Sequence, residues 1–216
     1  MNAQDRGDTV NFGALRAAML TFWEEFPNVH RSATLLTFYM DMFAKAHPDS
    51  VASAWASFVG CSSPVASELA RGKVRFAGLR QHPLECTFSL LDGRTLDLRS
   101  LRGKVVLIDF WATWCVPCVQ QLPTLKRLYA AYHKRGFEII GVSLDRDEDR
   151  QKFKDLLARE GISWPQQFGG GWQNPIATRF AVNALPTTFL LDKQGKIEGI
   201  SLDEDLESEV KALLGR

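Results

Sequence analysis

Two cysteines separated by two residues, Cys115 and Cys118, are the side chains in this chain best suited to chemistry. They follow the apolar run 105–112 and open a segment with helical character. Thiols at positions i and i+3 of a first helical turn can close a small disulfide ring. Unsatisfied backbone N–H groups and the helix dipole at that end stabilise the thiolate form of the first cysteine. The spacing therefore predicts a redox-active dithiol.

The same spacing also occurs in zinc sites and in pairs of ordinary buried cysteines. A structural zinc ion needs about four nitrogen or sulfur ligands, and the sequence contains no second Cys-x-x-Cys and no His-x-x-x-His. Val119 follows the second cysteine, which excludes the haem-attachment pattern. We therefore expect no metal and no organic cofactor, with the Cys115–Cys118 disulfide itself as the redox group.

The position of each cysteine indicates its role. We expect Cys115 to be the exposed, attacking thiolate, because a helix terminus lowers a thiol pKa from about 8.5 toward about 7. Cys118 lies one turn further into the helix, partly covered, and would resolve the mixed disulfide. Val116 and Pro117 bring neither a charge nor an imidazole to the pair. The reduced form is then not unusually stable, which favours a reductant over a strong oxidant.

Composition limits the classes of partner. The 216 residues are 45% hydrophobic, enough for a sizeable core, and 26 basic residues nearly balance 25 acidic ones. A formal charge of +1 without a basic run argues against a nucleic-acid partner. No apolar stretch approaches the roughly 20 residues that span a bilayer. Residues 1–30 contain no legible signal peptide or anchor.

Residues 1–80 form a helical N-terminal region in which nothing looks catalytic. Apolar side chains recur at helical spacing and are interrupted near Pro27 and Pro48, which predicts three or four short helices. Two further cysteines, Cys61 in this region and Cys86 after it, are expected to be buried free thiols. A bridge between them is the alternative in an oxidising compartment.

From about residue 81 the hydrophobic period changes to the alternation of strands. The pattern predicts a hairpin that turns at Asp92–Gly93, then a β-α-β unit, two helices capped by Asp147 and Asn174, a second hairpin and a last helix. The expected ranges after the first hairpin are 104–110, 115–135, 137–143, 147–160, 174–180, 189–191, 197–202 and a helix from about Asp203. This order implies a mixed sheet covered on both faces.

Residues 81–214 resemble the TlpA/ResA type of thiol-disulfide oxidoreductases within the thioredoxin superfamily. Two distant segments carry the resemblance. Gly103–Cys118 matches the family's strand and active-site turn, and Leu185–Asp192 matches its cis-proline strand. The leading hairpin and the segment 161–175 are more similar to TlpA/ResA proteins than to thioredoxin itself.

The resemblance implies an α/β thioredoxin-like fold over residues 81–216, with an N-terminal β-hairpin and a mixed central sheet, after the helical region 1–80. It also implies disulfide-containing protein substrates, an upstream thiol electron donor and a periplasmic or otherwise extracytoplasmic location. Peroxidases that share the fold have a threonine three residues before the reactive cysteine. This chain has Ala112 there, so we do not expect peroxidase activity.

The resemblance assigns roles to two further residues. Asp109, on an otherwise apolar strand, would be a buried acid-base group that takes the proton of Cys118. A structural aspartate with satisfied hydrogen bonds is the alternative. Pro186 would form a cis peptide that turns the backbone of Leu185 toward the cysteines for contact with a strand-like substrate.

The expected contacts to the substrate are Trp114, Val116, Pro117 and Leu185. Trp111 can join Trp114 in an apolar rim around the cysteines or lie in the core, and the sequence leaves both open. We predict a thiol-disulfide oxidoreductase that reduces disulfides in partner proteins. The alternative is a protein-binding module in which the thioredoxin fold is mainly a scaffold with a vestigial dithiol.

Overall fold

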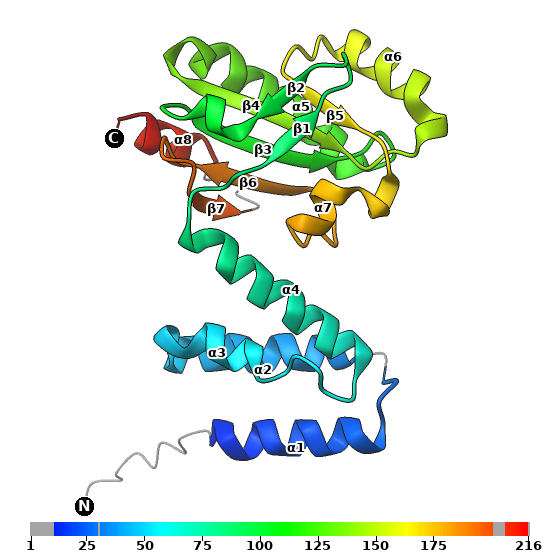
Figure 1. Ribbon diagram of the computed structural model, residues 1–216, viewed down its shortest axis with the longest axis vertical. Coiled ribbons are helices and arrows are strands. Elements are labelled where there is room, and N and C mark those ends of the chain that lie inside the picture. The colour runs from blue at the N-terminus through cyan, green and yellow to red at the C-terminus, as the bar shows by residue number, and fades with distance from the viewer. Residues whose placement is uncertain (1–10, 30, 201–205, 216) are drawn as a thin grey trace, which may run out of the picture. The chain divides into compact units, whose positions relative to one another are not determined.

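The computed structural model describes residues 11–29, 31–200 and 206–215, and the chain divides into two compact units, Met1–Ala77 and Gly78–Arg216 (Figure 1). Each unit has a hydrophobic core of its own. None of the helices within the described ranges is long and apolar enough to cross a membrane.

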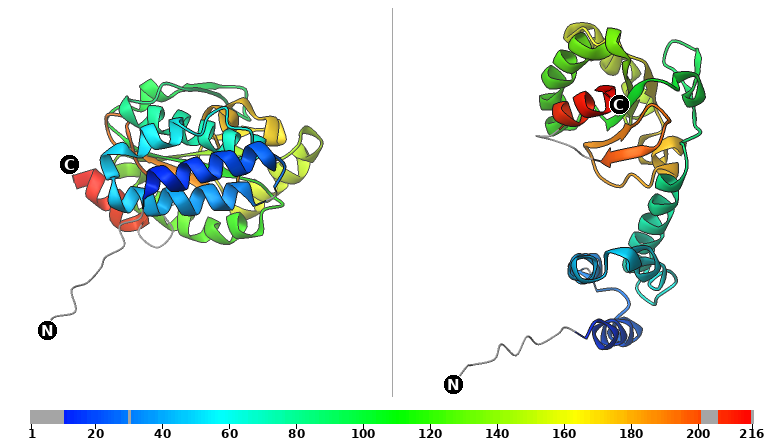
Figure 2. Two further views of the ribbon diagram at one scale, coloured as in Figure 1. Left: turned by 90° about the horizontal axis from the view of Figure 1, so that it is seen from below. Right: turned by 90° about the vertical axis from the view of Figure 1, so that its left-hand side faces the viewer.

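The described part of the first unit is helical, as predicted. Its helices are α1 (Phe12–Glu25), α2 (Ser32–Ala46), α3 (Val51–Ala56) and α4 (Pro64–Gln81), the last of which continues into the second unit. Helices α1 and α2 lie side by side (Figure 2). Their apolar faces meet those of α3 and α4 in a core made of Trp23, Leu36, Tyr39, Met40, Trp55, Phe58, Ala66 and Ala70. The helices therefore fold onto one another through a shared core.

A mixed sheet of five strands forms the centre of the second unit in the described ranges. Its order is β5 (Gln166–Phe168), β4 (Phe137–Ser143), β3 (Val105–Trp111), β6 (Thr187–Leu191) and β7 (Ile197–Ile200). Strands β3, β4 and β5 are parallel, whereas β6 and β7 are antiparallel to their neighbours. Before the sheet, β1 (Thr87–Ser89) pairs with β2 (Thr95–Asp97) in the predicted hairpin.

Helices cover both faces of this sheet, as predicted. Side chains alternate along β3, so Leu107 and Trp111 point to one face and Phe110 to the other. The first face packs against α5 (Val116–Tyr132), α6 (Arg150–Glu160) and α8 (Leu206–Gly215). Figure 2 shows α5 and α8 on the same side. On the second face, the rings of Phe110 and Phe180 lie 5.5 Å apart, at the end of α7 (Pro175–Arg179).

Two local expectations differ from the structure. The short strand β5 was not predicted, because a Gln-Gln-Phe segment has no alternation of its own and depends on pairing with β4. The cap assigned to Asp147 is wrong: this residue begins a 3₁₀ turn, and α6 starts at Arg150 without a side-chain cap.

Asn174 does cap α7, as predicted. Its side-chain oxygen accepts hydrogen bonds from the backbone N–H groups of Ile176 and Ala177, at 2.9 and 3.2 Å. The predicted start of the last helix, near Asp203, lies outside the described residues.

Candidate active site between strand β3 and helix α5

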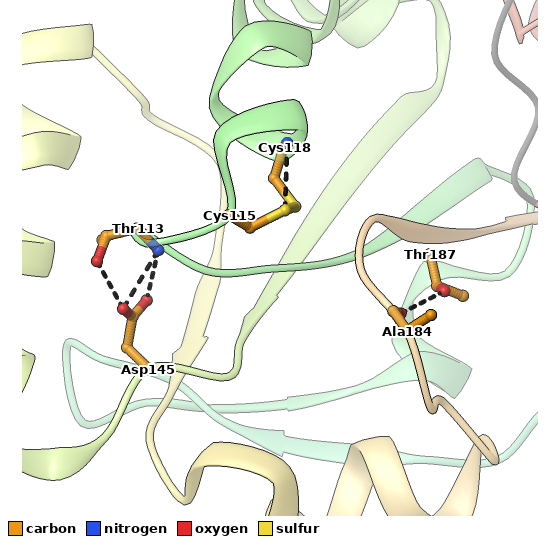
Figure 3. Close-up of a disulfide and its surroundings, with 6 residues drawn as sticks. All are labelled: Thr113, Cys115, Cys118, Asp145, Ala184 and Thr187. Carbon is orange, nitrogen blue, oxygen red and sulfur yellow. Dashed lines mark hydrogen bonds between the residues drawn. A yellow bond between two sulfur atoms is a disulfide. The ribbon is translucent and has the colours of Figure 1, made fainter. Parts of the chain in front are cut away.

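Cys115 and Cys118 form a disulfide where β3 leads into α5 (Figure 3). Cys115 is the N-cap residue of that helix, and the backbone N–H of Cys118 donates a hydrogen bond to Cys115 Sγ at 3.3 Å. Pro117 fits the first turn because its missing N–H would have no helical partner there. The first sulfur therefore lies at the positive end of the helix, where a thiolate is stabilised.

Both cysteines are buried in this oxidised form, with 5% of Cys115 and 3% of Cys118 exposed. The expectation of an exposed Cys115 is therefore wrong here. Its side chain turns back into the helix to reach Cys118, and Leu185 packs against the apolar cluster that contains both residues. The helix-cap position, rather than exposure, distinguishes the two sulfurs.

Asp109 lies in the middle of β3 and is only 3% exposed. It shares its face of the sheet with Leu107 and Trp111, the face that α5 and its Cys118 cover. Desolvation by this burial raises the pKa of the Asp109 carboxyl from 3.8 to about 7. A carboxyl with such a pKa can both accept and return a proton near neutral pH.

The Leu185–Pro186 peptide bond is cis and leads directly into β6. Because Thr187 pairs with Phe110 in the antiparallel ladder, Leu185 and Pro186 lie beside the end of β3 that carries the cysteines. The Thr187 hydroxyl donates a hydrogen bond to the carbonyl of Ala184 at 2.8 Å, which closes this turn (Figure 3).

Trp111, at the end of β3, and Trp114, next to Cys115, lie in different environments. Trp111 is 1% exposed, and its indole N–H donates a hydrogen bond to Gln166 Oε1 at 3.2 Å, so it belongs to the core. Trp114 is 47% exposed. Of the other expected substrate contacts, Val116 and Pro117 are exposed and Leu185 is partly buried. These four residues form the accessible border of the disulfide.

A pocket of about 560 Å³ opens next to Val116. It lies between the start of α5 and helix α6, and its lining is Thr113, Val116, Val119, Gln120, Lys152, Asp155, Leu156 and Arg159. The surface beside the disulfide is therefore concave next to Val116. The charged residues that line this pocket, Lys152, Asp155 and Arg159, all belong to α6.

Asp145 is a site residue that sequence reasoning missed. Its carboxylate is fully buried and accepts hydrogen bonds from the Thr113 backbone N–H at 3.0 Å and the Thr113 hydroxyl at 2.6 Å (Figure 3). The Ser143 hydroxyl donates a third hydrogen bond to it, at 2.8 Å. Thr113 is two residues before Cys115, so Asp145 holds the loop that positions the reactive pair. The available signal was a polar Ser143–Asp145 pair at the carboxyl end of a strand parallel to β3.

Thr113→Val is expected to weaken this attachment. The variant keeps the backbone N–H and the side-chain shape but leaves one lone pair of Asp145 without its donor, which costs about 1–3 kcal/mol. The free energy of unfolding in urea, measured on the oxidised protein, checks this. Thr124→Val, at an exposed position of α5, is the matched control and should change stability by less than about 0.5 kcal/mol. Equal losses in the two variants would contradict the assignment.

The remaining cysteines are both free. Cys86 is buried, as expected, whereas Cys61 is only partly buried against the core of the first unit. The alternative of a bridge between them is not realised. Among the described residues, no group of three or more His, Cys, Asp or Glu side chains is arranged to hold a metal ion.

Known proteins resemble the second unit. The Redoxin family matches residues 81–214. The thiol-disulfide oxidoreductase ResA of Bacillus thuringiensis is 36% identical over 124 residues, which cover 57% of this chain and 69% of the relative. A solved thioredoxin domain of a thiol-disulfide oxidoreductase from Bacteroides vulgatus superposes with a TM-score of 0.56 at 28% identity, over 63% of this chain and 97% of that one. A thiol-disulfide oxidoreductase from Bacteroides fragilis gives 0.55 at 29% identity, over 61% and 98%.

Proposed function

This chain belongs to the Redoxin family and is a thiol-disulfide oxidoreductase, and from that premise we propose that its Cys115–Cys118 pair reduces disulfides in partner polypeptides. The observation that carries the proposal is the placement of Cys115 as the N-cap of α5, within bonding distance of Cys118. A thiolate formed there is stabilised, and its resolving partner is already in place.

The proposed reaction transfers two electrons from the dithiol to the substrate. The Cys115 thiolate attacks one sulfur of the substrate disulfide, forming a mixed disulfide and releasing the other substrate sulfur as a thiolate. Cys118 then attacks Cys115 Sγ, which releases the second substrate sulfur and leaves the Cys115–Cys118 disulfide. A thiol donor must return two electrons before the next cycle. No metal or organic cofactor takes part in this scheme.

Asp109 is the proposed proton acceptor for the resolving step. Cys118 attacks as a thiolate, and its proton needs an acceptor in a region closed to water. Asp109 lies on the sheet face that the Cys118 helix covers, and burial raises its pKa to about 7. At neutral pH a substantial fraction of Asp109 is therefore ionised and able to accept that proton.

The residues between the cysteines support the proposed direction of the reaction. The side chains of Val116 and Pro117 add no charge and no hydrogen-bond donor that would make the reduced form exceptionally stable. We expect a reduction potential closer to that of thioredoxin, about −270 mV, than to that of DsbA, about −120 mV.

Equilibration of the full chain with a dithiol buffer, followed by thiol alkylation, measures this potential. Turnover is measured in parallel with insulin as a disulfide substrate and dithiothreitol as the donor. A potential below about −200 mV together with turnover supports the reductase. A potential near about −120 mV would instead indicate an oxidant. Binding of polypeptides without any turnover would indicate the scaffold alternative.

A further inference from the structure

Two exposed tryptophans meet beside the reactive loop. Trp114, the neighbour of Cys115, and Trp172 have ring centroids 6.2 Å apart, and they are 47% and 50% exposed. Aromatic side chains that are exposed together, rather than singly, offer an apolar surface for contact with a partner. Trp172 lies far along the chain, in the short 3₁₀ turn Gly171–Gln173 between β5 and α7.

The loops that carry the two tryptophans are attached to one residue. The Asp145 carboxylate binds Thr113, the neighbour of Trp114, while the Asp145 backbone carbonyl accepts a hydrogen bond from the N–H of Gly171 at 3.2 Å, beside Trp172. The loop of each tryptophan is therefore attached to the same point at the end of β4. Loops attached in this way lose little backbone freedom when a ligand contacts the rings.

Local structure makes the Trp172 turn stiff. Gly170 and Gly171 adopt left-handed φ values of 84° and 53°, which side chains with a Cβ rarely adopt. The fully buried Asn174 side chain stabilises the turn. Its amide group donates hydrogen bonds to the Gly169 carbonyl at 2.7 Å and to Gln167 Oε1 at 2.9 Å. This turn is built to present Trp172 at a defined place.

We propose that Trp114 and Trp172 form an aromatic clamp that selects substrate polypeptides with apolar side chains next to the reacting cysteine. The inference rests on the proposed function, because the substrate cysteine must reach Cys115 and its neighbours must then pass the adjoining Trp114. The border next to the clamp is apolar as well, with Val116 65% exposed and Pro117 exposed. Apolar residues of a substrate gain contact and lose water against these side chains, whereas serine, with little apolar surface, gains less.

Two symmetric peptide disulfides test the clamp. Both are dimers of Ac-Ala-Xaa-Cys-Xaa-Ala-amide, with Xaa either leucine or serine, and their reduction by the full chain is followed as kcat/KM. We expect the parent protein to prefer the leucine peptide by about tenfold, the lower end of the effect of one methylene group in an apolar pocket, because this site is open to solvent on one side. Trp172→Ala should reduce this preference to about twofold, by slowing reduction of the leucine peptide alone.

Two further variants separate the clamp from a general structural effect. Trp172→Phe should keep most of the preference, because a smaller aromatic ring still covers the site. Gln173→Ala, an exposed neighbour in the same turn, should change neither rate. The reduction potential of the Cys115–Cys118 couple should be the same in every variant, since the clamp is assigned no part in the redox step.

The outcomes distinguish failure of the inference from failure of the function. If the parent reduces both peptides and Trp172→Ala keeps the leucine preference, or loses both rates equally, the clamp is wrong while the reductase stands. If the parent reduces insulin but neither peptide, or reduces both peptides at the same rate, the clamp is wrong while the reductase stands. If the parent reduces neither the peptides nor insulin, the proposed function fails, and the clamp fails with it.

Discussion

Cys118→Ser will accumulate covalent complexes with disulfide-bearing proteins, whereas Cys115→Ser will form none. In the first variant the N-cap thiolate Cys115 can still attack, but no second thiol is within reach to release the partner. In the second variant the remaining thiol lies inside the first turn of α5 and lacks the helix-terminal position that stabilises a thiolate. Disulfide reductase turnover is lost completely in both.

Non-reducing electrophoresis after incubation with insulin, followed by mass spectrometry of the adducts, checks this prediction. Reduction of the adducts should return both proteins at their original masses. Cys61→Ser is the matched control, because this free cysteine lies in the first unit and is assigned no part in the reaction. Equal trapping by the Cys118 and Cys115 variants would overturn the assignment of attacking and resolving roles.

Asp109→Asn is expected to slow resolution of the mixed disulfide by about a hundredfold, the lower end of the usual contribution of a general base. In the parent protein the rate of this step should rise with pH through about 7, as Asp109 loses its proton. The asparagine variant should lack that rise. Rapid-quench measurement of the mixed disulfide at a series of pH values gives both results, and an unchanged profile would remove the proton-transfer role.

The same substitution should make the protein more stable at alkaline pH. Burial raises the pKa of Asp109 from 3.8 to about 7, so the folded state holds this proton more tightly than the unfolded state. The stability that this proton contributes is fully present below pH 3.8 and is lost as pH rises through about 7. Asparagine has no such dependence. At alkaline pH, Asp109→Asn should exceed the parent by a few kcal/mol, on the order of 1.4 kcal/mol for each unit of pKa shift.

Urea unfolding of the oxidised parent and the variant, at acidic and alkaline pH, checks the stability difference. A slower enzyme that is also more stable separates a catalytic role of Asp109 from damage to the fold. Parallel changes of stability with pH in the two proteins would show that Asp109 is not the buried acid described above.

Much of the fold could be predicted from local pattern. The apolar run before the cysteines forms β3, the strand predicted over residues 137–143 is β4 with those bounds, and Asn174 caps α7. The N-cap position of Cys115 was also predictable. These features depend on residues within one turn or one strand, where the spacing of side chains dictates which face they occupy.

Only the tertiary structure shows which aromatic and acidic side chains lie at the Cys115–Cys118 site. Trp111 and Trp114 are equally apolar in the sequence, yet Trp111 is core because α5 and α6 cover its face of β3. Gln166, 55 residues away, accepts its indole N–H. Asp145 meets Thr113 across 32 residues. Likewise, Trp172 reaches Trp114 only because its turn is attached to the end of β4.

Local features and tertiary contacts differ in predictability for a physical reason. By itself, the sequence determined the redox pair, the strand before it, the helix after it and the family they resemble, because covalent neighbours carry those signals. Burial, hydrogen-bond partners and the aromatic clamp depend on segments brought together when β3, β4 and β5 pair. A side chain's exposure and partners are properties of that packing, which spacing along the chain does not specify.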